Sequence, residues 1–324
     1  NPSSIHHFGR EARKILDDTR DELAKSIGTK GNNIIFTSGG TEADNLAIIG
    51  YAESNRSKGQ HIITTQIEHH AVLHSCEELE KRGFEVTYLP ADENGLVSLE
   101  KLNEALRDDT ILVTIMYGNN EVGTIQPIKE IGETLAEHQA VFHTDAVQAY
   151  GIEKLDVEEL KVDLLSVSAH KIYGPKGVGA CYINPQVRWE QVFPGTSHEK
   201  GFRPGTVNVP GIAAFLTAAE HILKNQKEES FRFKQLRFYF LEQLQTLPLE
   251  IEVKGHSTSC LPHIIGVTIK GIEGQYTMLE CNRHGIAIST GSACQVGKQD
   301  PSKTMLAIGK TYEEAKQYVR FSFG

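Results

Sequence analysis

The 324-residue sequence lacks several features that would define a membrane or secreted protein. It has no run of about 18 apolar residues, so we expect no membrane-spanning helix. It also has no recognisable signal peptide. Its five cysteines lie far apart, without a CxxC pair or zinc-ribbon spacing, which is typical of free thiols in a reducing compartment. We therefore expect a cytoplasmic protein that makes no membrane contact.

Positive charge and nucleotide-binding motifs are also scarce. The chain has 33 Lys and Arg against 42 Asp and Glu, a net charge of −9, which disfavours direct binding of nucleic acid. It contains neither GxGxxG nor GxxxxGK[ST], so a dinucleotide site and a P-loop are both disfavoured. His70 and His74 have i, i+4 spacing, but HExxH and a convincing third ligand are missing. We therefore expect no catalytic metal.

Short apolar segments alternate with helical patterns over the first two thirds of the chain. Strands are expected at 34–38, 61–65, 85–90, 111–117, 140–145, 163–171 and 179–183. Such continuous apolar runs between helices predict a mostly parallel sheet that is covered by helices on both faces. The fold class is therefore α/β.

The last third of the chain has a different pattern. Two long helical segments follow Pro210, and strands are expected at 264–269, 286–290 and 319–323, with a helix near 275–284. This arrangement predicts a smaller α+β domain. We expect a large α/β domain over 10–220, and a smaller domain over 221–324 that also includes residues 1–9.

Polar residues follow several of the predicted strands, where open α/β sheets bind their ligands. Gly39-Gly40-Thr41 opens a helix, which suits an anion, although an ordinary turn with Thr41 as N-cap fits equally well. Asp145 ends another strand, where it could cap a helix or keep a ring nitrogen protonated. Lys171 follows a buried strand in SVSAHKIYGPKG, shortly after Ser168 and His170.

A phosphate cradle, a carboxylate and a lysine on one sheet are the protein groups that pyridoxal phosphate (PLP) requires. Burial would make Lys171 lose its proton more readily, which suits an imine-forming base. His69 could reach a ring that lies over the strand ends and could move protons there. Cys294 lies in the polar, glycine-containing segment STGSACQVGKQD. It is either a reactive thiolate or a small buried side chain.

Nine stretches along the chain resemble the cysteine desulfurases of the NifS/IscS type, which are class V, fold-type I PLP enzymes. In order, they are NPSSIHHFGREAR, IIFTSGGTEADNLAI, IEHHAVLHSCEELE, NNEVGTIQPI, FHTDAVQA, SAHKIYGPKGVGA, RPGTVNVPG, STGSAC and VRFSFG. They span nearly the whole chain in the order of the family. The resemblance implies a large PLP-binding domain, a homodimer with shared active sites, and conversion of L-cysteine to L-alanine.

The resemblance also implies a role for each matching residue around the cofactor ring. Lys171 would be the Schiff-base lysine and would remove the α-proton of the substrate. Asp145 would keep the pyridine nitrogen protonated, and Gln148 would bond the ring hydroxyl oxygen. His69 would stack on the ring and act as an acid and base.

The remaining implied roles concern the phosphate, the substrate and the sulfur. The residues implied to bind the phosphate are Gly40, Thr41, Ser168, His170 and, from the second subunit, Thr206. Asn120 and Arg320 would hold the substrate carboxylate, which matches the fork of an arginine. Cys294 would attack the substrate sulfur and become a persulfide.

The family passes its persulfide sulfur to an acceptor protein, either an iron–sulfur scaffold or a tRNA-thiolating enzyme. A selenocysteine lyase or another class V PLP enzyme is an alternative, although Cys294 favours sulfur transfer because elimination alone needs no such nucleophile. A weakly active component of a sulfur relay is another alternative. It arises because FPGTSHEKGFRPGT departs from the family pattern: Thr196-Ser197 replace glycines, and Pro204 replaces a small residue.

Overall fold

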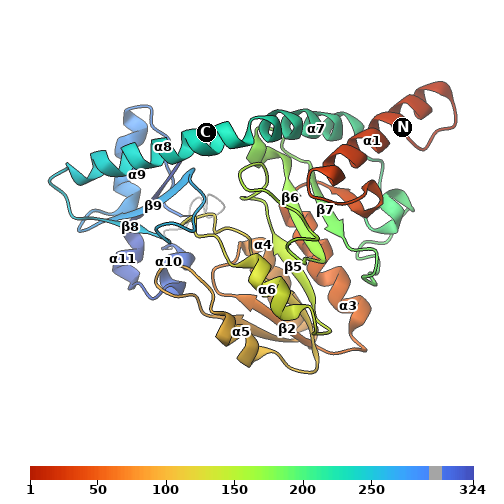
Figure 1. Ribbon diagram of the computed structural model, residues 1–324, viewed down its shortest axis with the longest axis horizontal. Helices are drawn as coiled ribbons and strands as arrows, with labels where there is room; N and C mark the ends of the chain where they lie inside the picture. The colour runs from red at the N-terminus through yellow and green to blue at the C-terminus, as the bar shows by residue number, and fades with distance from the viewer. Residues whose placement is uncertain (292–300) are drawn as a thin grey trace.

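A seven-stranded sheet forms the centre of the computed structural model, which describes residues 1–291 and 301–324 (Figure 1). Its strand order is β1–β7–β6–β5–β4–β2–β3, and β7 runs antiparallel to both of its neighbours while the other pairs are parallel. The strands are β1 Ile34–Thr37, β2 His61–Thr65, β3 Glu85–Leu89, β4 Thr110–Thr114, β5 Val141–Asp145, β6 Leu164–Ser168 and β7 Gly179–Ile183. The predicted mostly parallel α/β sheet is confirmed.

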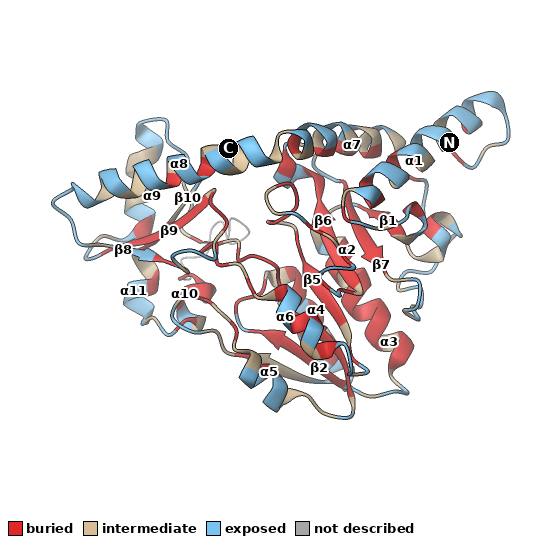
Figure 2. Ribbon diagram, in the orientation of Figure 1, coloured by how far each residue is buried: buried red, intermediate tan, exposed pale blue. Residues whose placement is uncertain are grey.

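Helices cover both faces of this sheet, so its strands, apart from the edge strand β3, are mostly buried (Figure 2). One face packs on α1 (His7–Lys25), α5 (Leu99–Ala105), α6 (Ile128–Leu135) and α7 (Val209–Lys224). The other packs on α2 (Gly40–Asn45), α3 (Tyr51–Asn55) and α4 (His70–Lys81). Successive strand residues alternate between the two faces: Ile34 and Phe36 belong to the first cluster and Ile35 to the second.

The helix expected from Thr41 onward contains a π-helical turn, η2, at Leu46–Gly50 between α2 and α3. The indole Nε1 of Trp189 donates to the Leu46 carbonyl oxygen at 2.8 Å. A side chain at Gly50 would collide with the same indole ring. Trp189 therefore stabilises the turn by bonding one of its carbonyl groups and by packing on the glycine surface.

A smaller three-stranded antiparallel sheet, in the order β10–β9–β8, follows in the last third of the chain. Its strands are β8 Ile251–Lys254, β9 Ile264–Ile269 and β10 Tyr318–Ser322, and its helices are α8 Gln226–Gln245, α9 Gly274–Arg283, α10 Lys303–Ala307 and α11 Tyr312–Lys316. The strand expected at 286–290 is wrong. Ser289 makes one isolated bridge to Arg320, and the apolar residues Ile286 and Ala287 are exposed, so this run lacks a continuous partner.

The predicted domain limits of 10–220 and 221–324 stay a prediction. Residues 1–9, which were grouped with the smaller domain, lie at the end of the molecule opposite the three-stranded sheet (Figure 1). There the Ser3 hydroxyl is 3.2 Å from His198 Nε2. Among the described residues, no helix combines the length and the apolar character that crossing a bilayer requires.

A buried ion pair fastens the 196–206 segment to the large sheet. Arg20 donates to both carboxylate oxygens of Glu199, at 2.5 and 2.7 Å, and to the Ile34 carbonyl at 2.6 Å. The Phe36 backbone N–H donates to the same carboxylate at 2.8 Å. Glu199 and Lys200 adopt left-handed φ values of 47° and 57°, which are unfavourable for side chains with a Cβ. The paired carboxylate offsets this cost.

We expect Glu199→Gln to lower the free energy of unfolding by about 3 kcal/mol, because it leaves the largely buried Arg20 guanidinium without its countercharge. Urea denaturation at neutral pH measures the loss. The matched control is Glu190→Gln, which breaks the solvent-exposed pair with Arg188 and should have little effect. Equal losses in the two variants would contradict the assignment.

Candidate active site

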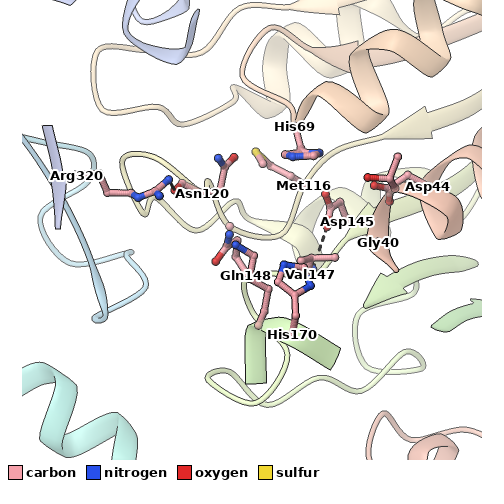
Figure 3. Close-up of a pocket in the computed structure, with 13 residues that line it drawn as sticks. Gly40, Asp44, His69, Met116, Asn120, Asp145, Val147, Gln148, His170 and Arg320 are labelled. Carbon is pink, nitrogen blue, oxygen red and sulfur yellow. Dashed lines mark hydrogen bonds between the residues drawn. The ribbon is translucent and has the colours of Figure 1, made fainter. Parts of the chain in front are cut away.

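A cavity of about 190 Å³ opens where β4, β5 and β6 end, and one residue of the smaller sheet reaches it (Figure 3). Its lining residues are Gly40, Thr41, Asp44, His69, Met116, Gly118, Asn120, Asp145, Val147, Gln148, His170, Lys171 and Arg320. Three predicted site residues are not part of this lining. Ser168 lies beside it, Thr206 is exposed elsewhere on the surface, and Cys294 lies outside the described residues.

Glycines form the part of the cavity that suits an anion. Gly39 has a φ of 149° and is the N-cap of α2, without any side-chain cap, so the alternative in which Thr41 caps the helix is wrong. The first backbone N–H groups of a helix have no acceptor within it. A Cβ at Gly40 would lie 2.8 Å from a Val147 methyl group, so the close approach of these segments requires glycine.

Two side chains, those of Ser168 and His170, lie next to this glycine turn. Ser168 Oγ is 2.8 Å from His170 Nδ1. Burial lowers the pKa of His170, and the positive charges of Lys171 and Lys176 lower it further. The imidazole is therefore a neutral hydrogen-bonding group at pH 7.

Asp145 ends β5 and is buried at the base of the cavity. One of its oxygens accepts the Val147 backbone N–H at 2.9 Å. Burial raises the pKa of Asp145 to about 6, while the Val147 N–H and the charge of Lys171 oppose this rise. A carboxylate in this position gains from a cationic partner, and a protonated ring nitrogen would supply one.

The prediction that Lys171 is buried is wrong for this chain. β6 ends at Ser168, and the short 3₁₀ helix η3 (Ala169–Ile172) places Lys171 at the open side of the cavity, where it is exposed. Tyr173 then adopts a left-handed φ of 65°, which ends the helical turn. Lys171 is therefore accessible from the cavity, as a covalent attachment point must be.

His69 is both the N-cap of α4 and a wall of the cavity. Its Nδ1 accepts the Ala71 backbone N–H at 3.1 Å, which leaves the ring proton on Nε2 when the imidazole is neutral. Burial lowers the pKa of His69, and Lys171 and His74 lower it further. His69 can therefore donate a hydrogen bond from Nε2 at neutral pH.

Sequence analysis missed Asp44, a buried cavity residue. A ligand-type atom from each of Asp44, His69 and Asp145 lies within 4.8 Å of the other two, and Figure 3 shows their side chains converging. Burial raises the pKa of Asp44 well above its usual range, and the charge of Asp145 raises it further. The two neighbouring carboxyls therefore favour a state in which only one of them is ionised. The absence of a catalytic metal stays a prediction.

Arg320 enters the cavity from β10, at the side nearest the smaller sheet. Its Nη1 donates to the Asn120 carbonyl oxygen at 2.8 Å. Its Nε has no hydrogen-bond acceptor among the described residues. Donors remain available on this guanidinium, and a carboxylate is the ligand that they fit.

Comparisons with known proteins agree with this geometry. The family model described as "Aminotransferase class-V" matches residues 1–324. The chain is 48% identical to "Putative cysteine desulfurase IscS 1" of Bacillus subtilis, with 100% of this chain and 86% of that protein covered. It is 46% identical to "Cysteine desulfurase IscS" of Dictyoglomus turgidum, with 100% and 82% covered.

Solved structures give the same result. A "NIFS-LIKE PROTEIN" superposes with a TM-score of 0.93 at 34% identity, with 100% of this chain and 86% of that chain covered. A structure described as "SspA in complex with cysteine" has a TM-score of 0.86 at 34% identity, with 100% and 90% covered. The resemblance inferred from the motifs is thus confirmed. The chain belongs to the class V aminotransferase family and, within it, to the cysteine desulfurases of the IscS and NifS type.

Proposed function

We propose that this cavity converts L-cysteine to L-alanine with the help of PLP, and that Cys294 receives the sulfur as a persulfide. The observation that carries the proposal is one cavity that combines Gly40, Asp145, Lys171 and Arg320. These residues offer an anion cradle, a buried carboxylate, an amine and a guanidinium. The family, which is PLP-dependent, makes the same chemistry the expected one.

The donor set of the cavity fits PLP. The groups that would hold its phosphate are the backbone N–H groups of Gly40 and Thr41 and the side chains of Ser168 and His170. Asp145, Gln148 and His69 would hold the ring, and Lys171 would attach the cofactor. When bound, PLP supplies an electron sink for the pair released at the α-carbon of an amino acid.

The residues of the chain would then divide the work. Arg320 and Asn120 hold the substrate carboxylate and orient the α-carbon toward Lys171 Nζ, which takes the α-proton. His69 donates or accepts a proton through Nε2.

The sulfur step balances as one substitution at sulfur. The Cys294 thiolate attacks the substrate sulfur, so an S–S bond forms as the Cβ–S bond breaks. The electron pair stays with the carbon, which is protonated to give alanine. The overall reaction is cysteine plus a thiol giving alanine plus a persulfide, without an external oxidant.

Two finer elements belong to the same proposal. Thr206 would bind the phosphate of a second subunit, and its exposure on this chain leaves it available to do so. The acceptor of the persulfide sulfur would be an iron–sulfur scaffold or a tRNA-thiolating enzyme. The segment before Thr206 departs from the family pattern, yet Arg203 still pairs with Glu42 at 3.3 Å, beside the glycine turn. This contact supports a functional position for the segment.

Lys171→Ala should abolish the bond between PLP and the protein, because no other amine occupies that position in the cavity lining described here. Borohydride reduction followed by peptide mass mapping measures the bond. Lys176→Ala, in the same loop but outside the cavity lining, is the matched control and should keep it. A reduced cofactor still attached to the Lys171→Ala protein would refute the assignment.

Cys294→Ser should keep the PLP absorbance and lose persulfide formation, since a hydroxyl cannot take over the sulfur. The assay reacts the protein with ³⁵S-labelled cysteine and follows the label on the protein. Cys281→Ser removes a partly exposed cysteine elsewhere in the chain and should retain the label. Wild-type labelling of the Cys294→Ser protein would reject the nucleophile role.

Asp145→Asn should stabilise the cofactor-free protein at pH 7.5 by up to about 3 kcal/mol, because the folded state raises the pKa of this carboxyl from 3.8 to about 6. The native carboxyl disfavours folding once it ionises. The gain should therefore shrink as the pH falls from 6 to 4, and vanish below 4, where Asp145 is protonated in both states.

Urea denaturation across this pH range measures the difference, and Asp108→Asn, at an exposed carboxyl, is the control. The same Asp145→Asn variant should lose desulfurase activity, because an amide cannot supply the charge that keeps a ring nitrogen protonated. A variant less stable than the wild type at pH 7.5 would contradict the buried-charge interpretation.

A further inference from the structure

A carboxyl that sequence analysis left unassigned, that of Glu121, lies beside the cavity in the turn after β4. The turn is held by the buried side chain of Asn119, whose Oδ1 accepts the backbone N–H groups of Glu121 and Val122 at 2.8 and 2.9 Å. The Asn119 amide nitrogen also donates to the Ile67 carbonyl at 3.0 Å. Glu121 therefore projects from a well-fixed backbone.

Glu121 is 5% exposed and lies close to residues on both sides of the segment 292–300. On the far side, the Ser302 hydroxyl donates to Glu121 Oε2 at 2.5 Å, and Thr304 also bonds the carboxylate. On the near side, Gly291 has a φ of 129°, and a Cβ there would lie 3.4 Å from the same oxygen and 3.5 Å from Ser302 Cβ. Ser302 thus bonds Glu121 Oε2, and Gly291 lies close to the same oxygen.

The same carboxyl is connected to the substrate-binding side of the cavity. Ser289 and Arg320 exchange two backbone hydrogen bonds, at 2.6 and 3.1 Å, and Ser289 Oγ donates to the Gly291 carbonyl at 2.7 Å. Tyr318, two residues before Arg320, donates its hydroxyl to the Glu121 carbonyl at 2.7 Å. One short network therefore joins Arg320, Gly291 and Glu121.

A buried carboxyl is expensive to retain. Desolvation raises the pKa of Glu121, while Ser302 and the charge of Arg320 oppose that rise. Thr304 opposes it as well, so the groups that favour the charged form come from two residues shortly after 292–300 and from the cavity. An apolar side chain would fill the same space at lower cost, so we look for a role in the reaction.

We propose that Glu121 is a positioning residue that holds Ser302 next to Gly291, and so keeps the ends of the segment bearing Cys294 in a fixed relation to Arg320. The inference rests on the proposed function in that Cys294 is the sulfur acceptor. Holding both ends lowers the entropy lost when the thiolate meets a substrate whose carboxylate is on Arg320. Glu121 itself need touch neither substrate nor cofactor.

The test compares Ser302→Ala and Glu121→Gln with a matched control, Thr311→Ala. Ser302 caps α10 through the Met305 N–H, and Thr311 caps α11, so both alanine variants lose a helix cap, but the side chain of Thr311 bonds Glu314, which is not part of this network. The first readout is the alkylation rate of Cys294 by iodoacetamide, measured by peptide mapping. The second is kcat and KM for L-cysteine.

We expect Ser302→Ala and Glu121→Gln to speed alkylation of Cys294 at least about threefold and to lower kcat roughly tenfold, with KM changed little, since substrate contacts remain. Thr311→Ala should change neither readout. Cys294 alkylation equal in all three variants would overturn the inference, even if stability falls. Alkylation of Cys294 does not require persulfide formation. It therefore tests the role of Glu121 independently of the ³⁵S labelling, which tests the proposed function.

Discussion

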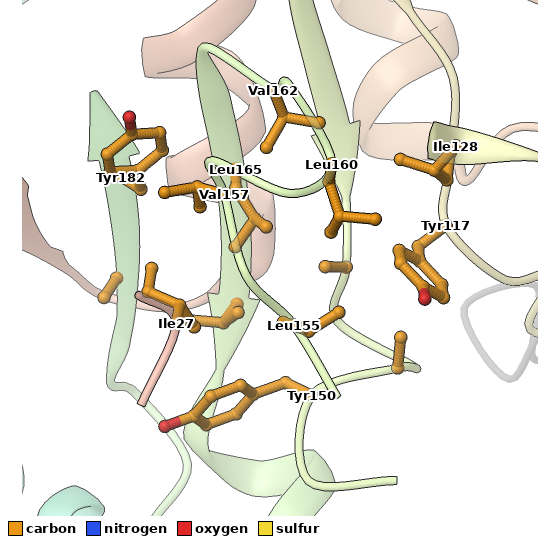
Figure 4. Close-up of a cluster of buried hydrophobic side chains, with 14 of the residues drawn as sticks. Ile27, Tyr117, Ile128, Tyr150, Leu155, Val157, Leu160, Val162, Leu165 and Tyr182 are labelled. Atoms are coloured by element: carbon orange, nitrogen blue, oxygen red, sulfur yellow. The ribbon is translucent and has the colours of Figure 1, made fainter. Parts of the chain in front are cut away.

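Burial of both faces of the seven-stranded sheet forces its polar chemistry to the ends of the strands. A polar side chain in the middle of such a strand has to find a hydrogen-bond partner inside the core. Figure 4 shows how densely Leu165, Val157 and their neighbours fill one face. Where a strand ends, backbone N–H groups and side chains can point into a cavity instead. The anion cradle, Asp145 and Lys171 lie together because their strands end at one edge of the sheet.

Burial also affects which of the carboxyl groups around the cavity are ionised. Asp44 and Asp145 in the cavity lining, and Glu68 just before His69 in the chain, are all buried, and desolvation raises the pKa of each, for Glu68 to about 8. Glu68 is therefore largely neutral at pH 7, and the mutual repulsion of Asp44 and Asp145 disfavours a negative charge on both of them. A negative charge on Asp145 would favour a cationic ring partner. Lys171 is exposed and His69 is neutral. In this site the degree of burial of each side chain therefore influences its protonation state.

Ion pairs and hydrogen bonds of carboxylates, in addition to apolar packing, fix the loops near this cavity. Glu199 binds Arg20 beneath the 196–206 segment, Glu42 pairs with Arg203, and Glu121 contacts Ser302. Each carboxylate joins residues more than 150 positions apart in the chain. The substitutions at 196, 197 and 204 thus occur in a segment whose anchoring residues, Glu199 and Arg203, are present.

Local sequence patterns determined the strands, most of the helices and the identity of the candidate site. The spacing of apolar residues and their number reflect backbone geometry over a few residues. Turns can be predicted where a glycine such as Gly39 follows a strand. The family motifs supplied roles for residues whose convergence could not be seen in the chain itself. The prediction of a strand at 286–290 was wrong because a strand needs a partner strand along its whole length. Whether such a partner is present depends on residues elsewhere in the chain.

Tertiary structure alone decided which side chains share a cavity and how deeply each is buried. Asp44 and Glu121 carry no pattern that separates them from ordinary surface acids, and their environments come from segments distant in the chain. Lys171 follows an apolar strand, yet a 3₁₀ turn brings it into the open. Desolvation and proximity are properties of the packed molecule, so the pKa shifts and the anchoring of loops emerge only when distant segments meet.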